Sequence, residues 1–416
     1  MRLSEYLKDK KKKWIVGAYI AGVVGVYTEP LFLLVYMIRQ IARKRLVHRQ
    51  FLLFLLLLLL HGVTMSFFTG YQLGKMFQQL LLLLIVYFGY IQLFSNSKAK
   101  LEEWFGIYLK ISYIVSILGL IQFAFKLLLD INIFPYTLDF RNTQNALRVH
   151  SILLEAGHLA LFLMPAVSYI IISKYFFINN KIKCTLILLT ALLTFSSSMY
   201  VGVIIALIYR FYDRIKRLKI IFYIIGCILL YTVVTADYSE SEYQEGASIK
   251  SASQKIIQTA DAFSVLMSPD SSPEYFESFN LSTYALLSNF WVALNAPYRV
   301  IGTGLGTHEQ NYVAKYNSNY IHYGFNKEDG YSLFIRLLSE FGYIGILLYS
   351  LFVIKSYNKR NVLSICFLIL IISALIKGGV YTLNCLALFH ILYYQCSKYM
   401  IDESLVINCL KRGKNV

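Results

Sequence analysis

An arginine, a glutamate and a histidine open an otherwise apolar stretch in the middle of the chain. Arg148, Glu155 and His158 begin the segment RVHSILLEAGHLALFLMP. Spacings of seven and three residues place all three on roughly one face of a helix. Ionisable groups beside apolar segments usually line a polar cavity or pair with one another. The stretch therefore predicts either a charged cavity at the outer end of a helix or a stabilising Arg148–Glu155 pair.

A second stretch, VIGTGLGTHEQNY, combines alternating glycines with a histidine. Gly302, Gly304 and Gly306 precede His308. Glycine gives the backbone the freedom that a tight turn needs, and bare backbone amides can also approach an anion. Because no strand–loop–helix unit surrounds the stretch, a nucleotide site is disfavoured. Two interpretations stay open: a tight turn that returns the chain to the next helix, or an anion-binding loop.

A third stretch, NKEDGYSLFIRLLSEFGYIGILL, places acidic residues before a long apolar run. Asp329 lies at its start, and Arg336 and Glu340 follow at the helical spacing of four residues, which allows them to pair with each other. Arg299 and His322, upstream of this run, add charge and proton-transfer capacity. Each single histidine is as consistent with an ordinary surface position as with catalysis.

The elements that carry these residues are predicted to be membrane helices. The 416 residues are 57% hydrophobic and 15% charged, whereas soluble domains have about 45–50% apolar and about 25% charged residues. Runs such as 51–68 and 78–94 approach the roughly 20 apolar residues that cross a bilayer. The net charge of +17 does not indicate nucleic acid, because the basic residues cluster at the ends of apolar segments. The six cysteines lack metal-ligand spacing.

Basic clusters assign the sides of the membrane. Under the positive-inside rule they mark the cytoplasmic face, and they lie at 8–13, 39–49, 98–100, 174–183, 210–219, 355–360 and in the tail. Segments 14–38 and 184–209 have basic clusters at both ends, so each is predicted to be a pair of short segments, with turns at 28–30 and 194–198. Between the clusters, single crossings are predicted at 51–69, 76–94, 106–128, 151–173, 219–236, 331–354, 361–376 and 380–396. This arrangement predicts about twelve transmembrane segments with both termini in the cytoplasm. The alternative is two long tilted helices and ten crossings.

The chain divides into three predicted regions. Residues 1–236 form an N-terminal transmembrane bundle, 237–330 a large external loop, and 331–416 the C-terminal segments and a cytoplasmic tail. The loop is the longest polar stretch, and its helix-like parts at 251–266 and 282–296 predict a partly helical cap on the outer face. The expected fold class is therefore an all-α polytopic membrane protein with one large extracytoplasmic loop.

Taken in this order, the three stretches resemble the bacterial Wzy-type polymerases of O-antigen and capsular repeat units, and the related O-antigen ligases. That family shows an arginine followed seven residues later by a glutamate, here Arg148 and Glu155. It also shows a glycine turn that closes a large external loop, and a later E-x-G-x-x-G pattern that begins here at Glu340. The serine-rich turn TFSSSMYVGV is similar to the family as well.

The resemblance implies a GT-C-like fold and a glycosyltransferase. Family members join oligosaccharide repeat units carried on undecaprenyl pyrophosphate, by inverting glycosyl transfer at the outer face of the bacterial cytoplasmic membrane. The expected partners are these lipid-linked donors and acceptors, membrane lipid, a chain-length regulator and a flippase, with no nucleic acid. The external regions carry no Asp-x-Asp pattern, so no metal and no cofactor are expected.

The resemblance also suggests roles for single residues. Arg148 and Arg299, together with the amides of 302–306, would oppose the charge that grows on the leaving pyrophosphate, because a guanidinium grips phosphate oxygens and stays charged. The attacking sugar hydroxyl needs a proton acceptor. The candidates for that acceptor are Glu155, His308, His322 and Asp329.

Two departures and two alternative functions qualify this interpretation. Ligase-like members carry His-Asn before the re-entering helix, whereas this chain has EDGY at 328–331, which favours a polymerase over an O-antigen or teichoic-type ligase. The family's earlier loop arginine is missing from 274–298, so Arg299 takes its place as the candidate. A twelve-segment secondary transporter or flippase of lipid-linked oligosaccharide is the alternative from another class, although transporters usually place polar groups at the bilayer midplane.

Overall fold

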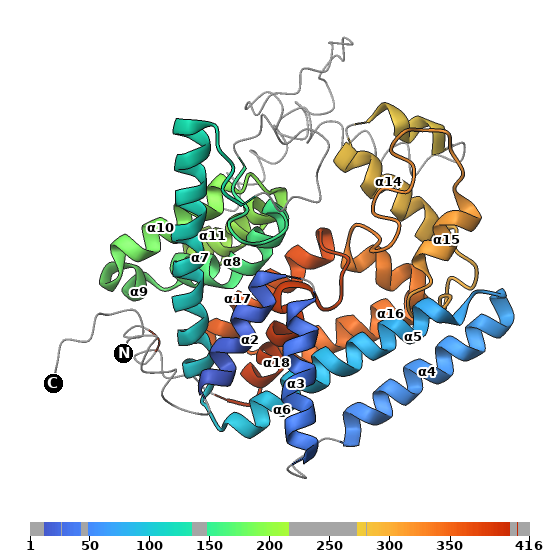
Figure 1. Cartoon of the computed structure of the whole chain (residues 1–416), viewed down its shortest axis with the longest axis horizontal. Coiled ribbons are helices and arrows are strands. Elements are labelled where there is room, and N and C mark those ends of the chain that lie inside the picture. Colours follow the sequence, from blue (N-terminus) through green and yellow to red (C-terminus); the bar gives the residue numbers. More distant parts are fainter. Residues whose placement is uncertain are drawn as a thin grey trace.

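A computed structural model describes residues 12–25, 27–42, 49–134, 148–215, 273–279, 281–399 and 406. Every regular element in these ranges is a helix, so the all-α prediction is confirmed for the described part of the chain (Figure 1). The predicted segment at 219–236, the helix-like part at 251–266 and most of the tail lie outside the described residues.

Four described helices are long and apolar enough to cross a bilayer. They are α4 (Arg49–Thr69), the continuous run of α5 (Leu73–Leu83), η1 (Leu84–Phe88) and α6 (Gly89–Ser97), α7 (Leu101–Leu129) and α16 (Leu333–Ser356). Shorter apolar helices accompany them: α8 (Ala156–Ile172), α11 (Ser197–Ile215), α14 (Leu281–Leu294), α17 (Val362–Ile376) and α18 (Leu386–Cys396). These helices indicate a membrane-embedded protein, while twelve crossings and the positions of the termini stay predictions.

The two ranges with basic clusters at both ends each contain a pair of helices. Residues 14–38 fall in α2 (Lys12–Val24) and α3 (Thr28–Ala42), and residues 184–209 fall in α10 (Lys181–Leu193) and α11. The turn predicted at 28–30 is misplaced, because Thr28 already begins α3 and donates its hydroxyl to the carbonyl of Gly25 at 2.8 Å. Proline is tolerated in this first helical turn, where its missing amide leaves no bond unmade.

Helix α8 is the centre of the hydrophobic core. It packs against α7, α10, α11 and α17, and most of its residues are buried. Pro165 interrupts its hydrogen bonding, and Tyr108 of α7 inserts at that point. The Tyr108 hydroxyl donates to the carbonyl of Phe162 at 2.6 Å and accepts from the amide of Ala166 at 3.1 Å. The neighbouring helix thereby satisfies the backbone pair 162/166, which opens next to the proline in an apolar environment.

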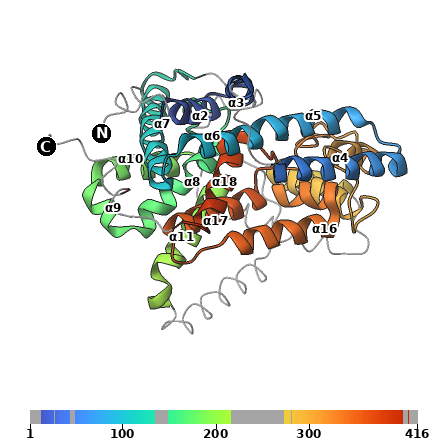
Figure 2. The same ribbon diagram turned by 90° about the horizontal axis from the view of Figure 1, so that it is seen from below.

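The described end of the large polar region forms a small helical unit with its own core. Helix η2 (Pro273–Ser278), α14 and α15 (His308–Lys315) enclose a cluster of buried aromatic residues. Its largest members are Phe276, Tyr284, Tyr312 and Tyr316. Together with α4, this unit lies at the end of the molecule opposite α7, α9 (Lys174–Asn179) and α10 (Figures 1 and 2). The helix predicted at 282–296 corresponds to α14.

Candidate functional site

Helix α16 is broken at Gly342, and the chain just before the glycine turn repairs the break. Gly342 has φ 62° and ψ −159°, which no helix allows. The amides of 343–344, which would otherwise bond within the helix, donate to the carbonyls of 299–300 at 3.0 Å. In return, the amide of Gly304 donates to the carbonyl of Glu340 at 2.8 Å. Irregular backbone inside an apolar helix is tolerated when another segment satisfies it in this way.

Each glycine of the turn allows a close approach to a different helix. A Cβ on Gly302 would lie 2.4 Å from backbone atoms of α16, one on Gly304 3.3 Å from α4, and one on Gly306 3.0 Å from a carbonyl of α5. All three have a left-handed φ, between 74° and 107°. The amides of Gly302 and Gly304 donate to backbone carbonyls of the protein. The tight-turn interpretation accounts for all of these contacts, and two of the amides proposed for an anion are already engaged.

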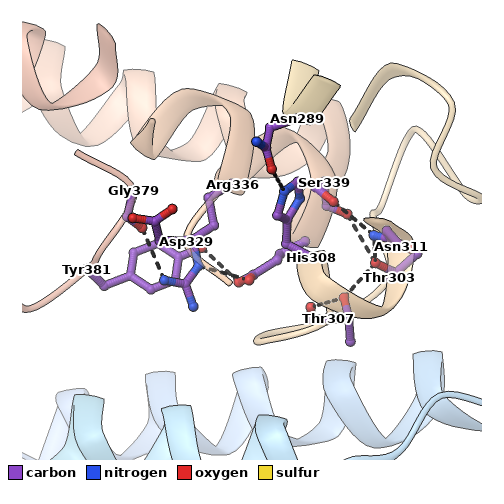
Figure 3. Close-up of polar contacts among 12 residues, drawn as sticks. Asn289, Thr303, Thr307, His308, Asn311, Asp329, Arg336, Ser339, Gly379 and Tyr381 are labelled. Atoms are coloured by element: carbon purple, nitrogen blue, oxygen red, sulfur yellow. Dashed lines mark hydrogen bonds and ion pairs between the residues drawn. The ribbon is translucent and has the colours of Figure 1, made fainter. Parts of the chain in front are cut away.

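A buried ion pair lies in α16 just before the break. Arg336 donates from Nε to Glu340 Oε1 at 2.9 Å and from a terminal nitrogen to the carbonyl of Gly379 at 3.1 Å (Figure 3). Tyr381 donates to the other oxygen of Glu340 at 2.9 Å, and its ring lies 4.4 Å from the guanidinium carbon. The two charges are 3% and 0% exposed. The pairing that the four-residue spacing allows is therefore observed, and the two side chains also fasten α16 to residues 379–381.

A second polar network joins the glycine turn, α15 and α16. The hydroxyls of Thr303 and Thr307 lie 2.6 Å apart, and Asn311 donates to Thr303 at 2.7 Å and to the Ser339 hydroxyl at 2.8 Å. Thr303, Asn311 and Ser339 are fully buried. Buried polar groups that satisfy one another rigidify their surroundings. The network consequently holds His308, which begins α15, in a fixed place (Figure 3).

His308 is a buried, neutral side chain. Its Nε2 lies 2.9 Å from the Asn289 side-chain oxygen, an arrangement that assigns the ring proton to Nε2. Burial, and secondly the positive charge of Arg336, lower the pKa of His308 to about 3. The ring also packs against Gly330, where a Cβ would lie 3.3 Å away. A group with so low a pKa is a poor proton acceptor at neutral pH, so His308 is better suited to holding the loop that contains Asp329.

An ionic clamp attaches that loop to α5. Glu309 accepts from Lys75 at 2.6 Å and from Lys327 at 3.3 Å. Burial raises the pKa of Glu309, but the two lysines outweigh it and leave the pKa below its ordinary value. Next to this clamp, the side chain of Gln310 exchanges two hydrogen bonds with the backbone of Gln72, at 2.7 and 3.2 Å. The beginning of α5 is thus tied to the unit that carries His308 and Asp329.

Within the described part of the chain, the hydrogen bonds of the Asp329 carboxylate involve one of its two oxygens. Its Oδ1 accepts from the Asn326 side chain and from the amide of Tyr331, both at 3.1 Å. Burial raises the pKa of Asp329, although these bonds and the charge of Arg336 act in the opposite direction. Gly379 lies so close that a Cβ there would be 1.7 Å from the Asp329 carbonyl oxygen. Only glycine at this position lets the chain after α17 pack beside the carboxylate.

A small cavity lies between this carboxylate and α8. Its volume is about 40 Å³, and its polar lining residues are His158, Asp329 and Asn384. Leucine and phenylalanine side chains form most of the rest of its wall. The charges of Glu155 and Lys377 act on the His158 ring, as does that of Asp329. The sequence candidates His158 and Asp329 therefore meet at this cavity from distant parts of the chain, and the charge of Glu155 acts on both.

The predicted common helical face of Arg148, Glu155 and His158 is wrong. Helix α8 begins only at Ala156, and Glu155 precedes it with an extended backbone. The reason is tertiary: the side-chain oxygen of Gln122, in α7, accepts from the amides of 150–151 at 3.1 and 2.8 Å. These bonds fix a non-helical loop that local spacing does not reveal.

The remaining candidates lie apart from the cavity. Arg148 donates to the carbonyl of Thr194, in the turn between α10 and α11, at 3.2 Å. Arg299 is exposed, and its guanidinium lies 3.5 Å from the Asn295 side chain. The ring of His322 packs edge-on against Tyr320, with centroids 5.2 Å apart. Arg148, Arg299 and His322 thus contact other neighbours, whereas Asp329 lines the cavity.

Sequence reasoning missed Lys377, Gly379, Tyr381 and Asn384, which come from the connection between α17 and α18. Their types and spacing match no chemical motif. The one local signal was the glycine pair at 378–379, since adjacent glycines indicate a close backbone approach.

A scan against protein-family models finds no match for the chain, and a search of curated proteins finds none either.

Proposed function

We propose that the chain is a membrane glycosyltransferase that joins undecaprenyl-pyrophosphate-linked oligosaccharide units into a polysaccharide, at the outer face of the bacterial cytoplasmic membrane. One observation carries the proposal. Asp329, a carboxylate whose pKa is raised by burial, borders a cavity where the end of the polar region 273–330 meets the apolar helices α8, α17 and α18. A proton acceptor at such a junction suits a reaction between a lipid-borne donor and a polar sugar.

The chemistry assigns each group a task. Asp329 accepts the proton of the acceptor hydroxyl as its oxygen attacks the anomeric carbon, and a raised pKa makes the carboxylate a better acceptor. The bond to the pyrophosphate breaks, and the leaving group carries away the electron pair. Lys377, whose charge acts close to the cavity, would oppose the growing negative charge. Arg336 is a weaker candidate for this task, because its charge is paired with Glu340 and a second donor is bonded to the carbonyl of Gly379.

Reconstituted polymerisation tests the proposal. Purified protein in liposomes, supplied with lipid-linked oligosaccharide units, should produce a ladder of lengthened chains. Asp329→Asn keeps the shape of the side chain and should lower the rate by about 100-fold or more, the usual contribution of a proton acceptor. Asp130→Asn, at an aspartate that is 86% exposed on its side chain, is the matched control and should leave the rate unchanged. Polymer formation at an equal rate in Asp329→Asn would refute the assignment.

A transporter of lipid-linked units is the second candidate, and one buried carboxylate favours it. Glu29 is 3% exposed; it accepts from the Tyr90 hydroxyl at 2.5 Å and from the amide of Cys385 at 3.3 Å. Among the described residues it forms no ion pair. Buried carboxylates within membrane bundles often mark proton pathways. Movement of labelled lipid-linked units across liposomes, abolished by Glu29→Gln with no polymer formed by the wild type, would favour transport.

A further inference from the structure

Two polar atoms at the cavity beside Asp329 have no hydrogen-bond partner within the described part of the chain. They are Nδ1 of His158 and the side-chain nitrogen of Asn384, and both are buried. Asn384 as a whole is only 7% exposed. An unsatisfied buried polar group costs about 1–3 kcal/mol, so most such groups in folded proteins bind something. Two of them, on residues that line one cavity together with a carboxylate, indicate a ligand.

The backbone holds Asn384 in an uncommon conformation that points to a role for its side chain. Asn384 has φ 51° and ψ 49°, and Cys385 follows with φ 66°, so two successive residues are left-handed without being glycine. The amide of Cys385 is fixed by its bond to Glu29 at 3.3 Å. Such conformations persist where the surrounding structure enforces them, and they concentrate at functional positions. Asparagine is among the few residues that tolerate this region.

The size and chemistry of the cavity select the ligand. A volume of about 40 Å³ is enough for a group the size of a water molecule, which needs about 10–15 Å³ of such space. A hydroxyl group both donates and accepts, so it can satisfy a carboxylate, an imidazole nitrogen and an amide at once. Asp329 and His158 are only half-buried, which lets a hydroxyl on a larger molecule approach from the surface.

We propose that this cavity is the acceptor-hydroxyl subsite, in which Asp329, His158 and Asn384 bind one oxygen atom. Water fills it until a hydroxyl of the incoming sugar replaces that water. This inference rests on the proposed function and names two further catalytic residues for it. The hydroxyl donates its proton to the Asp329 carboxylate, and the Asn384 amide donates to the same oxygen. During transfer that proton moves to Asp329, the oxygen bonds to the anomeric carbon, and the pyrophosphate leaves with the electrons of the broken bond.

Substitution of Asn384 tests the subsite without removing the backbone conformation. Asn384→Gly keeps the left-handed geometry and deletes the amide, and Asn384→Asp keeps the shape but replaces the donor by an acceptor. With lipid-linked units as substrate, both variants should lower kcat/KM for the acceptor by about 10–100-fold, the effect of one lost hydrogen bond to a buried site. The donor KM should stay unchanged. Asn317→Gly, at an exposed loop position, is the control and should behave as the wild type.

A high-resolution structure of the full chain separates this inference from the function on which it rests. An ordered oxygen within hydrogen-bond distance of Asn384 and Asp329, absent in Asn384→Leu, is the expected result. An empty cavity in the wild type would overturn the inference whatever the activity. If polymer forms and Asn384→Gly has wild-type kinetics, the subsite is wrong and the proposed function stands. If the oxygen is present but the wild type makes no polymer, the proposed function fails, and the acceptor role of the cavity fails with it.

Discussion

Substituting Gly302 tests whether the glycine turn supports α16 or presents its amides to a ligand. In Gly302→Ala the new Cβ would lie 2.4 Å from the carbonyl carbon and oxygen of Glu340 and from the amide nitrogen of Phe341. All three are backbone atoms, so a side-chain rotation cannot relieve the overlap. The turn must move, and the bond from Gly304 to Glu340, 2.8 Å long, must lengthen or break.

The expected loss of stability follows from these contacts. A left-handed conformation costs an alanine about 1–2 kcal/mol, and Gly302 has φ 74°. Loss of the Gly304 bond leaves a buried amide and a buried carbonyl, at about 1–3 kcal/mol each. The sum is about 3–8 kcal/mol. Gly70 offers a matched control, because its φ is 71° and a Cβ there meets nothing within 4 Å. Gly70→Ala should therefore lose only the conformational part, about 1–2 kcal/mol.

Thermal unfolding of the detergent-purified variants provides the assay. In a chain of this length, each kcal/mol lost from the free energy of unfolding lowers the unfolding midpoint by about 1 °C. Gly302→Ala should therefore unfold several degrees below Gly70→Ala. The midpoint is taken from the fraction of protein that stays monodisperse after heating. Equal midpoints for the two variants would refute the supporting role. An unchanged midpoint in Gly302→Ala together with lost polymer formation would instead support the anion-binding interpretation.

Three further predictions concern buried charge. Glu340→Gln leaves the Arg336 charge uncompensated and should lower the free energy of unfolding by about 3–5 kcal/mol. Asp130→Asn is the control, because it breaks the exposed Lys126–Asp130 pair, which contributes at most about 1 kcal/mol. Equal unfolding midpoints for the two variants would contradict this prediction. The pKa of His308 is about 3 in the folded chain, against an ordinary 6.5. Between pH 3 and pH 6.5, His308 is therefore protonated only in the unfolded chain. Stability should therefore fall as the pH drops below 6.5, by about 2 kcal/mol at pH 5, and His308→Gln should reduce the difference between the midpoints at pH 7.5 and pH 5. Because the pKa of Asp329 is raised above its ordinary 3.8, polymer formation should be lost as the pH falls through that raised pKa, and Asp329→Glu should shift this acidic limb; an identical limb would exclude Asp329 as its source.

Local patterns predicted the helices well, because an apolar run of sufficient length has few other folds available in a bilayer. The long helix predicted at 331–354 corresponds to α16, and that predicted at 361–376 corresponds to α17. The pairing of Arg336 with Glu340 followed from the same logic, since both lie on one helix four residues apart. Features internal to one element were thus accessible from the sequence.

Features that depend on several elements were not accessible. The loop before α8 is held by Gln122, a residue of α7, so spacing within 148–158 gave the wrong backbone. The cavity combines α8, the loop at Asp329 and the connection that contains Asn384. No sequence spacing relates these three segments, and the packing that unites them depends on the absence of a side chain at Gly379.

The break in α16 has a consequence for engineering. The amides of 343–344 bond to the carbonyls of 299–300, so two stretches far apart in sequence share one set of backbone hydrogen bonds. A chimera that exchanged only the 298–306 segment, or only the helix, would leave backbone groups of the other segment without hydrogen-bond partners in an apolar setting. Grafts between related proteins should therefore transfer 298–306 and 339–345 as one inseparable module.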